Sequence, residues 1–262
     1  MTGTYFLDLR DAPKPSHTTP ASHNPRPLYT ESPTLRGKRA RVRKEGGIKR
    51  IVLHQWGVAV SLPKASLAQV DQAKDHDREL ARQLAYRAAG LNSKGKPRRL
   101  GGTPYHVSVG VTATGNGVVA LVWPRETHTF HAEAANAESI GVGIMARFTR
   151  DDDAPRPPGL AVALRWGIVI AGELVRGTWH ESTERVVQEG FSTLDAWWPY
   201  EQPVPLRTHS QTQRKPADPG MWAIRHGVSP LLGIGAVSVE PDFWTDTGQP
   251  WPASWRRGLK GL

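Results

Sequence analysis

The chain has 262 residues and a mass of 28.8 kDa, and 38% of its residues are hydrophobic, which is enough for one sizeable core. It contains no cysteine, so disulfides and thiolate ligands are excluded, and any bound metal must be held by His, Asp or Glu. The formal charge of +10 and the isoelectric point near 10.1 favour a polyanionic partner such as nucleic acid, an anionic cell wall or a membrane surface.

Residues 1–47 are expected to form a flexible, basic and Pro-rich arm. The first ten residues, MTGTYFLDLR, lack the basic start and long apolar stretch of a secretory signal peptide, so we expect synthesis in the cytoplasm and either release or non-classical export. Residues 11–47 are rich in Pro, Ser, Thr and His and turn basic from Arg36 to Lys44. This composition buries too little apolar surface to order itself, and it suits either a solvated tail or an anchor for an anionic polymer.

Strand and helix patterns begin after this arm. Residues 48–54 (IKRIVLH) are typical of a buried strand that ends at His54. Apolar residues at helical spacing then predict an amphipathic helix over 66–89. Two β-like runs, one from Tyr105 and one from Val118, are joined by turn residues and predict a hairpin.

The second half of the chain continues the alternation. The pattern predicts a strand over 140–145, an apolar helix over 160–175, a second amphipathic helix over 183–190 and a short strand that ends near His209. The apolar helix is too short to span a bilayer and carries two charged residues. We therefore expect a buried core helix and no membrane span.

Alternating strands and helices predict an α/β fold in which helices flank a mixed central β-sheet. One domain is expected over residues 48–225, preceded by the arm as an N-terminal extension. Residues 226–262 are expected to form a C-terminal extension that packs on this domain or is partly flexible. The sequence contains no internal repeat.

Three residues far apart in the chain have side chains that suit one zinc ion. His54 closes the apolar run of residues 51–53, His209 follows a Pro-Leu-Arg-Thr segment, and Asp218 lies in the stretch RKPADPG at 214–220. Two imidazoles and one carboxylate fill three of zinc's four tetrahedral positions, and a fourth position left to water separates a catalytic zinc from a structural one. A lone strand-end histidine is more often a core or surface residue, but the three residues together indicate a hydrolytic zinc.

Several segments, taken in order, resemble the zinc-dependent N-acetylmuramoyl-L-alanine amidases, whose fold is shared with phage amidase lysozymes and peptidoglycan recognition proteins. The segments are IVLH ending at His54, PYHV around Tyr105, FHA around His131 with NAESIGV after it, and His209 with the later Asp218-Pro219-Gly220. The resemblance covers the whole predicted domain. It implies that His54, His209 and Asp218 bind Zn²⁺ and that the chain hydrolyses the amide bond between N-acetylmuramic acid and L-alanine in peptidoglycan.

The resemblance also implies roles for residues around the metal. Tyr105 matches a family tyrosine whose hydroxyl stabilises the developing oxyanion, with aromatic packing as the alternative role. Lys215 matches a family lysine with the same task, but it lies three positions before Asp218, whereas many relatives space the pair by two, so Arg214 is the substitute candidate. His131 matches a family histidine that faces substrate without binding metal.

Aromatic and basic residues suggest how a wall substrate would be held. Trp56 and Trp123 are candidates to stack on sugar rings, although ten Trp in one chain more often indicate core packing. Asn136 is expected to structure its loop. Peptidoglycan carboxylates and other anionic wall polymers would account for the positive charge of the chain.

Two other classes of function compete with the amidase. One is a peptidoglycan-binding module that keeps the fold without hydrolysis; such proteins commonly lack a zinc ligand, whereas this chain has all three. The other is a nucleic-acid-binding protein that uses the basic arm and the C-terminal WRRGLK run, for which no recognised motif is present. The sequence assigns neither the oligomeric state nor the peptide-stem preference, and it does not separate a phage lysin or secreted effector from a recycling enzyme.

Overall fold

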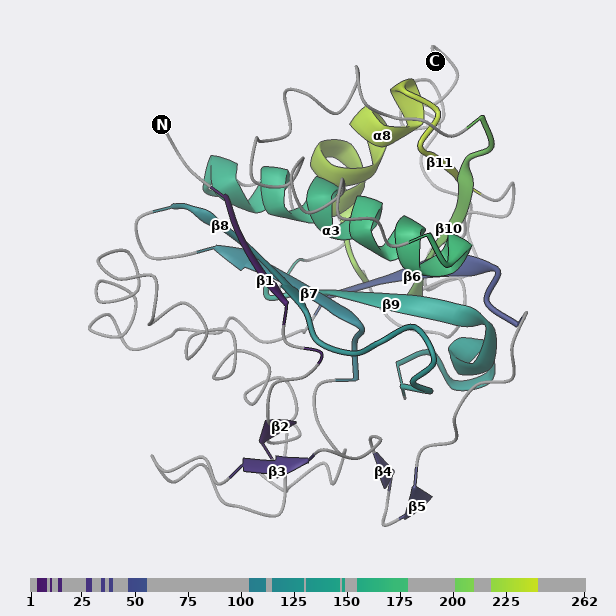
Figure 1. The fold of residues 1–262 in the computed structure, drawn as a ribbon. Coiled ribbons are helices and arrows are strands. Elements are labelled where there is room, and N and C mark those ends of the chain that lie inside the picture. The colour runs from purple at the N-terminus through teal and green to yellow at the C-terminus, as the bar shows by residue number, and fades with distance from the viewer. Residues whose placement is uncertain are drawn as a thin grey trace.

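A computed structural model describes residues 4–8, 10, 14–15, 27–29, 34–35, 38–39, 47–55, 104–111, 115–129, 131–146, 148, 155–178, 201–209 and 218–239. Within these ranges a seven-stranded β-sheet forms the centre of the molecule, with the long helix of residues 158–176 packed on one face (Figure 1). The helices predicted over 66–89 and 183–190 lie outside the described residues.

The sheet is mixed, as the sequence predicted. All neighbouring strands run parallel except the hairpin pair β7 and β8, which is antiparallel. In spatial order the strands are β1 (Thr4–Asp8), β8 (Gly117–Leu121), β7 (Val107–Val111), β9 (Ser139–Ile144), β6 (Arg50–Gln55), β10 (Val204–Thr208) and β11 (Val237–Val239). The fold is therefore α/β with a mixed central sheet.

Two strands of this sheet lie outside the predicted 48–225 domain. β1 pairs in parallel with β8 at the edge of the sheet, and β11 pairs in parallel with β10 at the opposite edge. Residues 4–8 thus differ from the flexible arm predicted over 1–47. Four further short strands form two separate antiparallel pairs, β2 (Lys14–Pro15) with β3 (Pro27–Tyr29) and β4 (Thr34–Leu35) with β5 (Lys38–Arg39).

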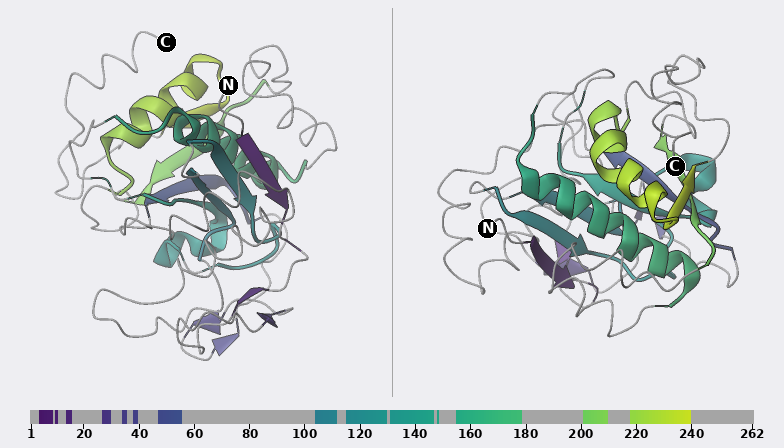
Figure 2. Two further views of the ribbon diagram at one scale, coloured as in Figure 1. Left: turned by 90° about the vertical axis from the view of Figure 1, so that its left-hand side faces the viewer. Right: turned by 90° about the horizontal axis from the view of Figure 1, so that it is seen from above.

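Helix α3 (Pro158–Arg176) is the element that builds the core. It begins with a proline in its first turn, where no amide donor is needed, and ends at Gly177, whose left-handed φ of 75° suits a glycine. Figure 2 shows α3 lying across the sheet. The helix is long and apolar enough to cross a membrane, but 72% of its most apolar window is buried inside the protein. It is packed as the core helix that the sequence predicted.

The other helical segments within the described residues are short. η1 (Glu133–Glu138) is a 3-10 helix that leads directly into β9. The segment after Asp218 contains α7 (Met221–Ala223), the π-helix η3 (Ile224–Val228) and α8 (Ser229–Gly233). η3 packs against α3, so this segment lies on the same face of the sheet as the core helix (Figure 2).

The side chains of β6 alternate between the hydrophobic core on one face of the sheet and the candidate site on the other. Successive side chains of a strand point to opposite faces, and Ile51 and Leu53 belong to the hydrophobic core with α3. His54 therefore lies on the face away from α3. Because Thr208 of β10 pairs with Leu53, His209 follows at the level of His54 on the neighbouring strand.

Candidate metal centre

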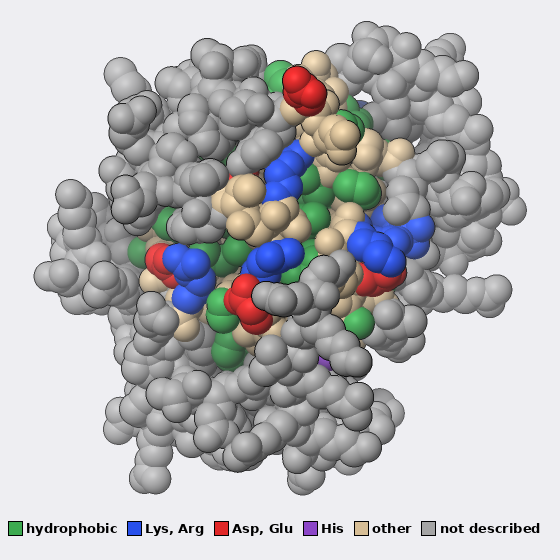
Figure 3. Space-filling view, turned by 45° about the vertical axis from the view of Figure 1, so that its right-hand side comes forward, with side chains coloured by type: hydrophobic (Ala, Val, Ile, Leu, Met, Phe, Trp, Pro, Cys, Tyr) green, Lys and Arg blue, Asp and Glu red, His purple; other side chains and the backbone are tan. Residues whose placement is uncertain are grey.

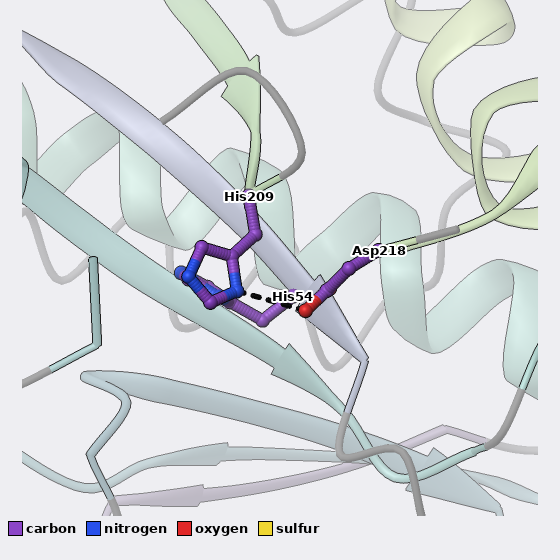
Figure 4. A group of neighbouring side chains, drawn as sticks. All are labelled: His54, His209 and Asp218. Atoms are coloured by element: carbon purple, nitrogen blue, oxygen red, sulfur yellow. Dashed lines mark hydrogen bonds and ion pairs between the residues drawn. The ribbon is translucent and has the colours of Figure 1, made fainter. Parts of the chain in front are cut away.

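The structure brings the three predicted metal ligands together. His54, His209 and Asp218 are all buried, and the ligand atoms that they offer lie within 4.8 Å of one another. Figure 4 shows the three side chains converging, with His54 coming from β6, His209 from the end of β10 and Asp218 from the loop before α7. Residues separated by as many as 164 positions thus form one cluster.

Asp218 connects the cluster to the backbone of β6. Its Oδ2 lies 2.8 Å from Nδ1 of His209, and its Oδ1 accepts a hydrogen bond of 2.7 Å from the backbone N–H of Gln55. The side chain of Gln55 is also hydrogen-bonded: its Oε1 accepts from the backbone N–H of Phe148. The carboxylate is therefore oriented by the strand that carries His54.

The donor set and its spacing fit zinc. Zn–N and Zn–O bonds of about 2.0–2.2 Å with tetrahedral angles place neighbouring ligand atoms roughly 3.3–3.6 Å apart. The atoms of the cluster, within 4.8 Å of one another, need only small side-chain shifts to reach that spacing. Two imidazoles and a carboxylate leave one vertex open, which is the arrangement of a catalytic zinc.

Tyr105 lies beside the cluster, as its predicted role requires. Its ring centroid is 5.0 Å from that of His54, with an angle of 39° between the ring planes, and the residue is half-buried. The ring centroids of His54 and His209 are 4.3 Å apart. The tyrosine ring thus borders the His54, His209 and Asp218 cluster.

His131 lies against His54. The sequence had predicted that this histidine faces substrate. The side chain is only 6% exposed, and its Nδ1 lies 2.9 Å from Nε2 of His54. Its ring covers Gly141 of β9, where an added Cβ would lie 2.8 Å from Cγ of His131. The described contacts of this histidine are therefore with the protein interior.

Asn136 fixes the loop that carries His131. Its Oδ1 accepts hydrogen bonds from the backbone N–H groups of His131 at 2.8 Å and of Ala132 at 2.5 Å. Both donors are on the turn that enters η1, so the amide oxygen substitutes for missing backbone acceptors. The loop-structuring role predicted for Asn136 is confirmed.

The other predicted site residues have separate outcomes. Trp56, Arg214 and Lys215 lie outside the described residues, so their roles stay predictions. Trp123 is only 4% exposed. It is a packing residue, which is the alternative that its sequence context had left open.

Sequence reasoning missed two buried residues near the cluster. His106 is fully buried; its Nδ1 accepts a hydrogen bond from the backbone N–H of Gly141, and its Nε2 lies 2.9 Å from the carbonyl oxygen of Thr127. Ser139, the first residue of β9, contacts His131. The sequence signal for His106 was its place directly after Tyr105, but nothing in the sequence specified its partners.

The cluster is recessed from the described surface. In the space-filling view of Figure 3, Lys and Arg side chains are interspersed with Asp and Glu, and only a small patch of histidine is visible at the lower edge of the coloured region. Arg50 pairs with Glu138 at 3.3 Å, and Lys49 pairs with the same carboxylate at 3.4 Å. The charges of these three side chains are thus partly balanced, while His54, His209 and Asp218 are buried.

Comparisons with known proteins give distant structural similarity. No protein-family model matches the sequence, and no curated protein matches it. The endolysin N-acetylmuramoyl-L-alanine amidase LysCS from Clostridium intestinale URNW aligns at 12% identity and a TM-score of 0.39, over 89% of this chain and 97% of its own. Bumblebee peptidoglycan recognition protein SA aligns at 12% identity and a TM-score of 0.40, over 91% and 98%.

A second recognition protein shows a similar degree of likeness. Drosophila peptidoglycan recognition protein SD aligns at 14% identity and a TM-score of 0.34, over 76% of this chain and 91% of its own. At such identities and TM-scores the likeness says nothing about activity. The chemistry of this chain is therefore inferred from its own residues.

Proposed function

We propose that the chain is a zinc-dependent N-acetylmuramoyl-L-alanine amidase that cleaves the bond between the lactyl group of N-acetylmuramic acid and L-alanine in peptidoglycan. The observation that carries the proposal is the convergence of His54, His209 and Asp218, all buried and with ligand atoms within 4.8 Å. The order of motifs along the chain, from IVLH to the Asp-Pro-Gly segment, supports the same assignment.

The residues around the cluster can perform the steps that amide hydrolysis needs. Zinc in a three-ligand site supplies Lewis acidity and a water of lowered pKa. Tyr105 borders the cluster and would donate its hydroxyl hydrogen to the oxygen on which negative charge develops. The backbone N–H of Gln55 would keep the Asp218 carboxylate turned toward the metal position while the substrate amide is bound.

A non-catalytic peptidoglycan-binding module is the competing function. It would bind peptidoglycan at the same residues without breaking a bond. The complete ligand set favours the enzyme, because a binding protein has no need of three converging metal ligands with an open fourth vertex.

Mass spectrometry of digested peptidoglycan tests the proposal. The zinc-loaded protein is expected to release stem peptides with a free L-alanine amino group and to leave the glycan strands intact. Asp218→Asn, which keeps the side-chain volume and removes the charge, and His54→Ala are expected to abolish release. Unchanged muropeptides in the presence of stoichiometric zinc would leave the binding module as the function.

A further inference from the structure

A hydrogen-bonded chain of three side chains runs behind the candidate metal ligand His54. Oγ of Ser139 lies 3.3 Å from Nε2 of His131, and Nδ1 of His131 lies 2.9 Å from Nε2 of His54. Ser139 is fully buried, as is His54, and His131 is 6% exposed. We call these three residues the Ser139–His131–His54 chain.

The direction of the hydrogen bonds is set at the serine end. The hydroxyl of Ser139 donates its one hydrogen to the backbone carbonyl oxygen of Ala135 at 2.6 Å. Its oxygen can then only accept a hydrogen from Nε2 of His131. A neutral His131 that carries its hydrogen on Nε2 has an unprotonated Nδ1, which must accept from Nε2–H of His54.

This pattern of hydrogen bonds determines the tautomer of His54. A neutral His54 that donates from Nε2 has its lone pair on Nδ1, and that atom is fully buried in the structure. Resting on the proposed zinc site, we propose that His131 is a positioning residue that holds His54 in the Nε2–H tautomer, so that Nδ1 is the atom presented to zinc. Metal-binding histidines commonly donate their second ring N–H to such a partner.

Two features keep His131 in its position. Asn136 accepts hydrogen bonds from the backbone N–H groups of His131 and Ala132, which fixes the loop. Gly141, in β9 beneath the ring, leaves the space that a larger residue would fill, since a Cβ there would lie 2.8 Å from Cγ of His131. The hydrogen bonds of Asn136 thus fix the backbone at His131, and packing on Gly141 fixes the ring.

Nuclear magnetic resonance of the metal-free protein tests the tautomer directly. Long-range nitrogen–proton correlations of the imidazoles are expected to show His54 and His131 with their hydrogens on Nε2. A His54 that carries its hydrogen on Nδ1 would overturn the proposal. This measurement does not depend on zinc, so it stands even if the proposed hydrolase activity fails.

Zinc affinity, measured by competition with a chromophoric chelator, gives the second readout. His131→Phe keeps a ring but removes the acceptor, and it is expected to weaken zinc binding 10-fold to 100-fold. His131→Gln, whose amide oxygen can accept from His54, is expected to restore most of the affinity. An affinity of His131→Phe within twofold of the wild type would contradict the proposal.

A matched control separates positioning from general loss of a buried histidine. His106→Gln changes the hydrogen bonds that a neighbouring buried histidine makes to Gly141, Thr127 and Thr129 without altering a member of the Ser139–His131–His54 chain. It is expected to lower the melting temperature while zinc affinity stays within twofold. Ser139→Ala, which removes the acceptor at the far end, is expected to weaken zinc binding less than His131→Phe does. If the wild-type protein binds no zinc, the proposed function fails and the tautomer result alone decides the positioning role.

Discussion

Single atoms around His54 decide what the site can do. Tyr105 is the candidate oxyanion donor among the residues that the structure describes. Its ring centroid lies 5.0 Å from that of His54. Tyr105→Phe keeps the ring and removes the donor. The change is expected to lower kcat by about 10²-fold to 10³-fold and to leave zinc affinity unchanged. Steady-state kinetics on a soluble muropeptide measure this, and an unchanged kcat would return Tyr105 to a packing role.

Asn136 offers a test of how the His131 loop is held. Asn136→Ala would leave two backbone N–H groups without their acceptor in a buried turn, so the free energy of unfolding is expected to fall by about 1–3 kcal/mol. Asn136→Asp keeps an acceptor oxygen at the same position and is expected to lose less. Chemical denaturation of the two variants measures the difference, and equal losses would show that the two hydrogen bonds do not stabilise the loop.

At the residue level, the sequence identified three side chains that the structure brings together, while their role as metal ligands stays a prediction. His54, His209 and Asp218 were found because strand ends and a Pro-Gly loop mark them, and the structure brings them together. The contact between His131 and His54 was not predictable. It depends on the path of the chain between β8 and β9, and no local pattern encodes that path.

At the scale of secondary structure, the packing of α3 against the sheet holds the site face in place from behind. Gly167 allows this close approach, because a Cβ there would lie 2.3 Å from Cγ1 of Val109. Gly167→Ala is therefore expected to destabilise the protein by about 1–3 kcal/mol through overpacking. Thermal and chemical unfolding measure the change.

Gly172 in the same helix provides the matched control. A Cβ there would meet Nη1 of Arg176 at 3.4 Å and Cγ2 of Val204 at 3.5 Å, which are ordinary contacts. Gly172→Ala is expected to leave stability unchanged or raise it by about 0.5–1 kcal/mol, because alanine suits a helix interior better than glycine. Equal destabilisation by both substitutions would show that the close contact with Val109 is not what makes Gly167→Ala destabilising.

Elements with a strong periodic signal were predicted well. The strand at β6, the β7–β8 hairpin, β9, α3 and β10 all appear close to their expected positions. β1 and β11 were missed as parts of the sheet, because each forms a single edge strand whose pairing partner is distant or unmarked in the sequence. Strand pairing depends on long-range contacts, whereas hydrophobic periodicity reports only on local structure.

At the scale of the whole molecule, zinc binding should contribute to stability. A ligand that binds only the folded state at 100 times its Kd adds about 2.7 kcal/mol, which for a chain of this size raises the melting temperature by roughly 5–10 °C. Differential scanning calorimetry with and without zinc measures the shift. Asp218→Asn should show little or none, and an equal shift in that variant would place the stabilising ion elsewhere.

The charge of the chain predicts salt-dependent attachment to an anionic wall. Residues 36–44 (RGKRARVRK) carry six Lys and Arg and no acidic residue. Deleting them is expected to weaken binding to isolated cell walls at low ionic strength and to have little effect at 0.5 M salt, because screening removes the same attraction. Co-sedimentation measures this. A salt-independent loss would indicate specific recognition by the segment, and steeply salt-dependent binding of duplex DNA that needs these residues would favour nucleic acid as the partner.

We expect His54, His209 and Asp218 to hold one zinc ion with an open vertex. Anomalous diffraction at the zinc edge, from crystals grown with zinc, locates that ion. One strong peak is expected about 2.0–2.2 Å from a ligand atom of each of the three side chains. A well-ordered crystal with no peak among them, or with the ion bound by a different set of residues, would contradict it.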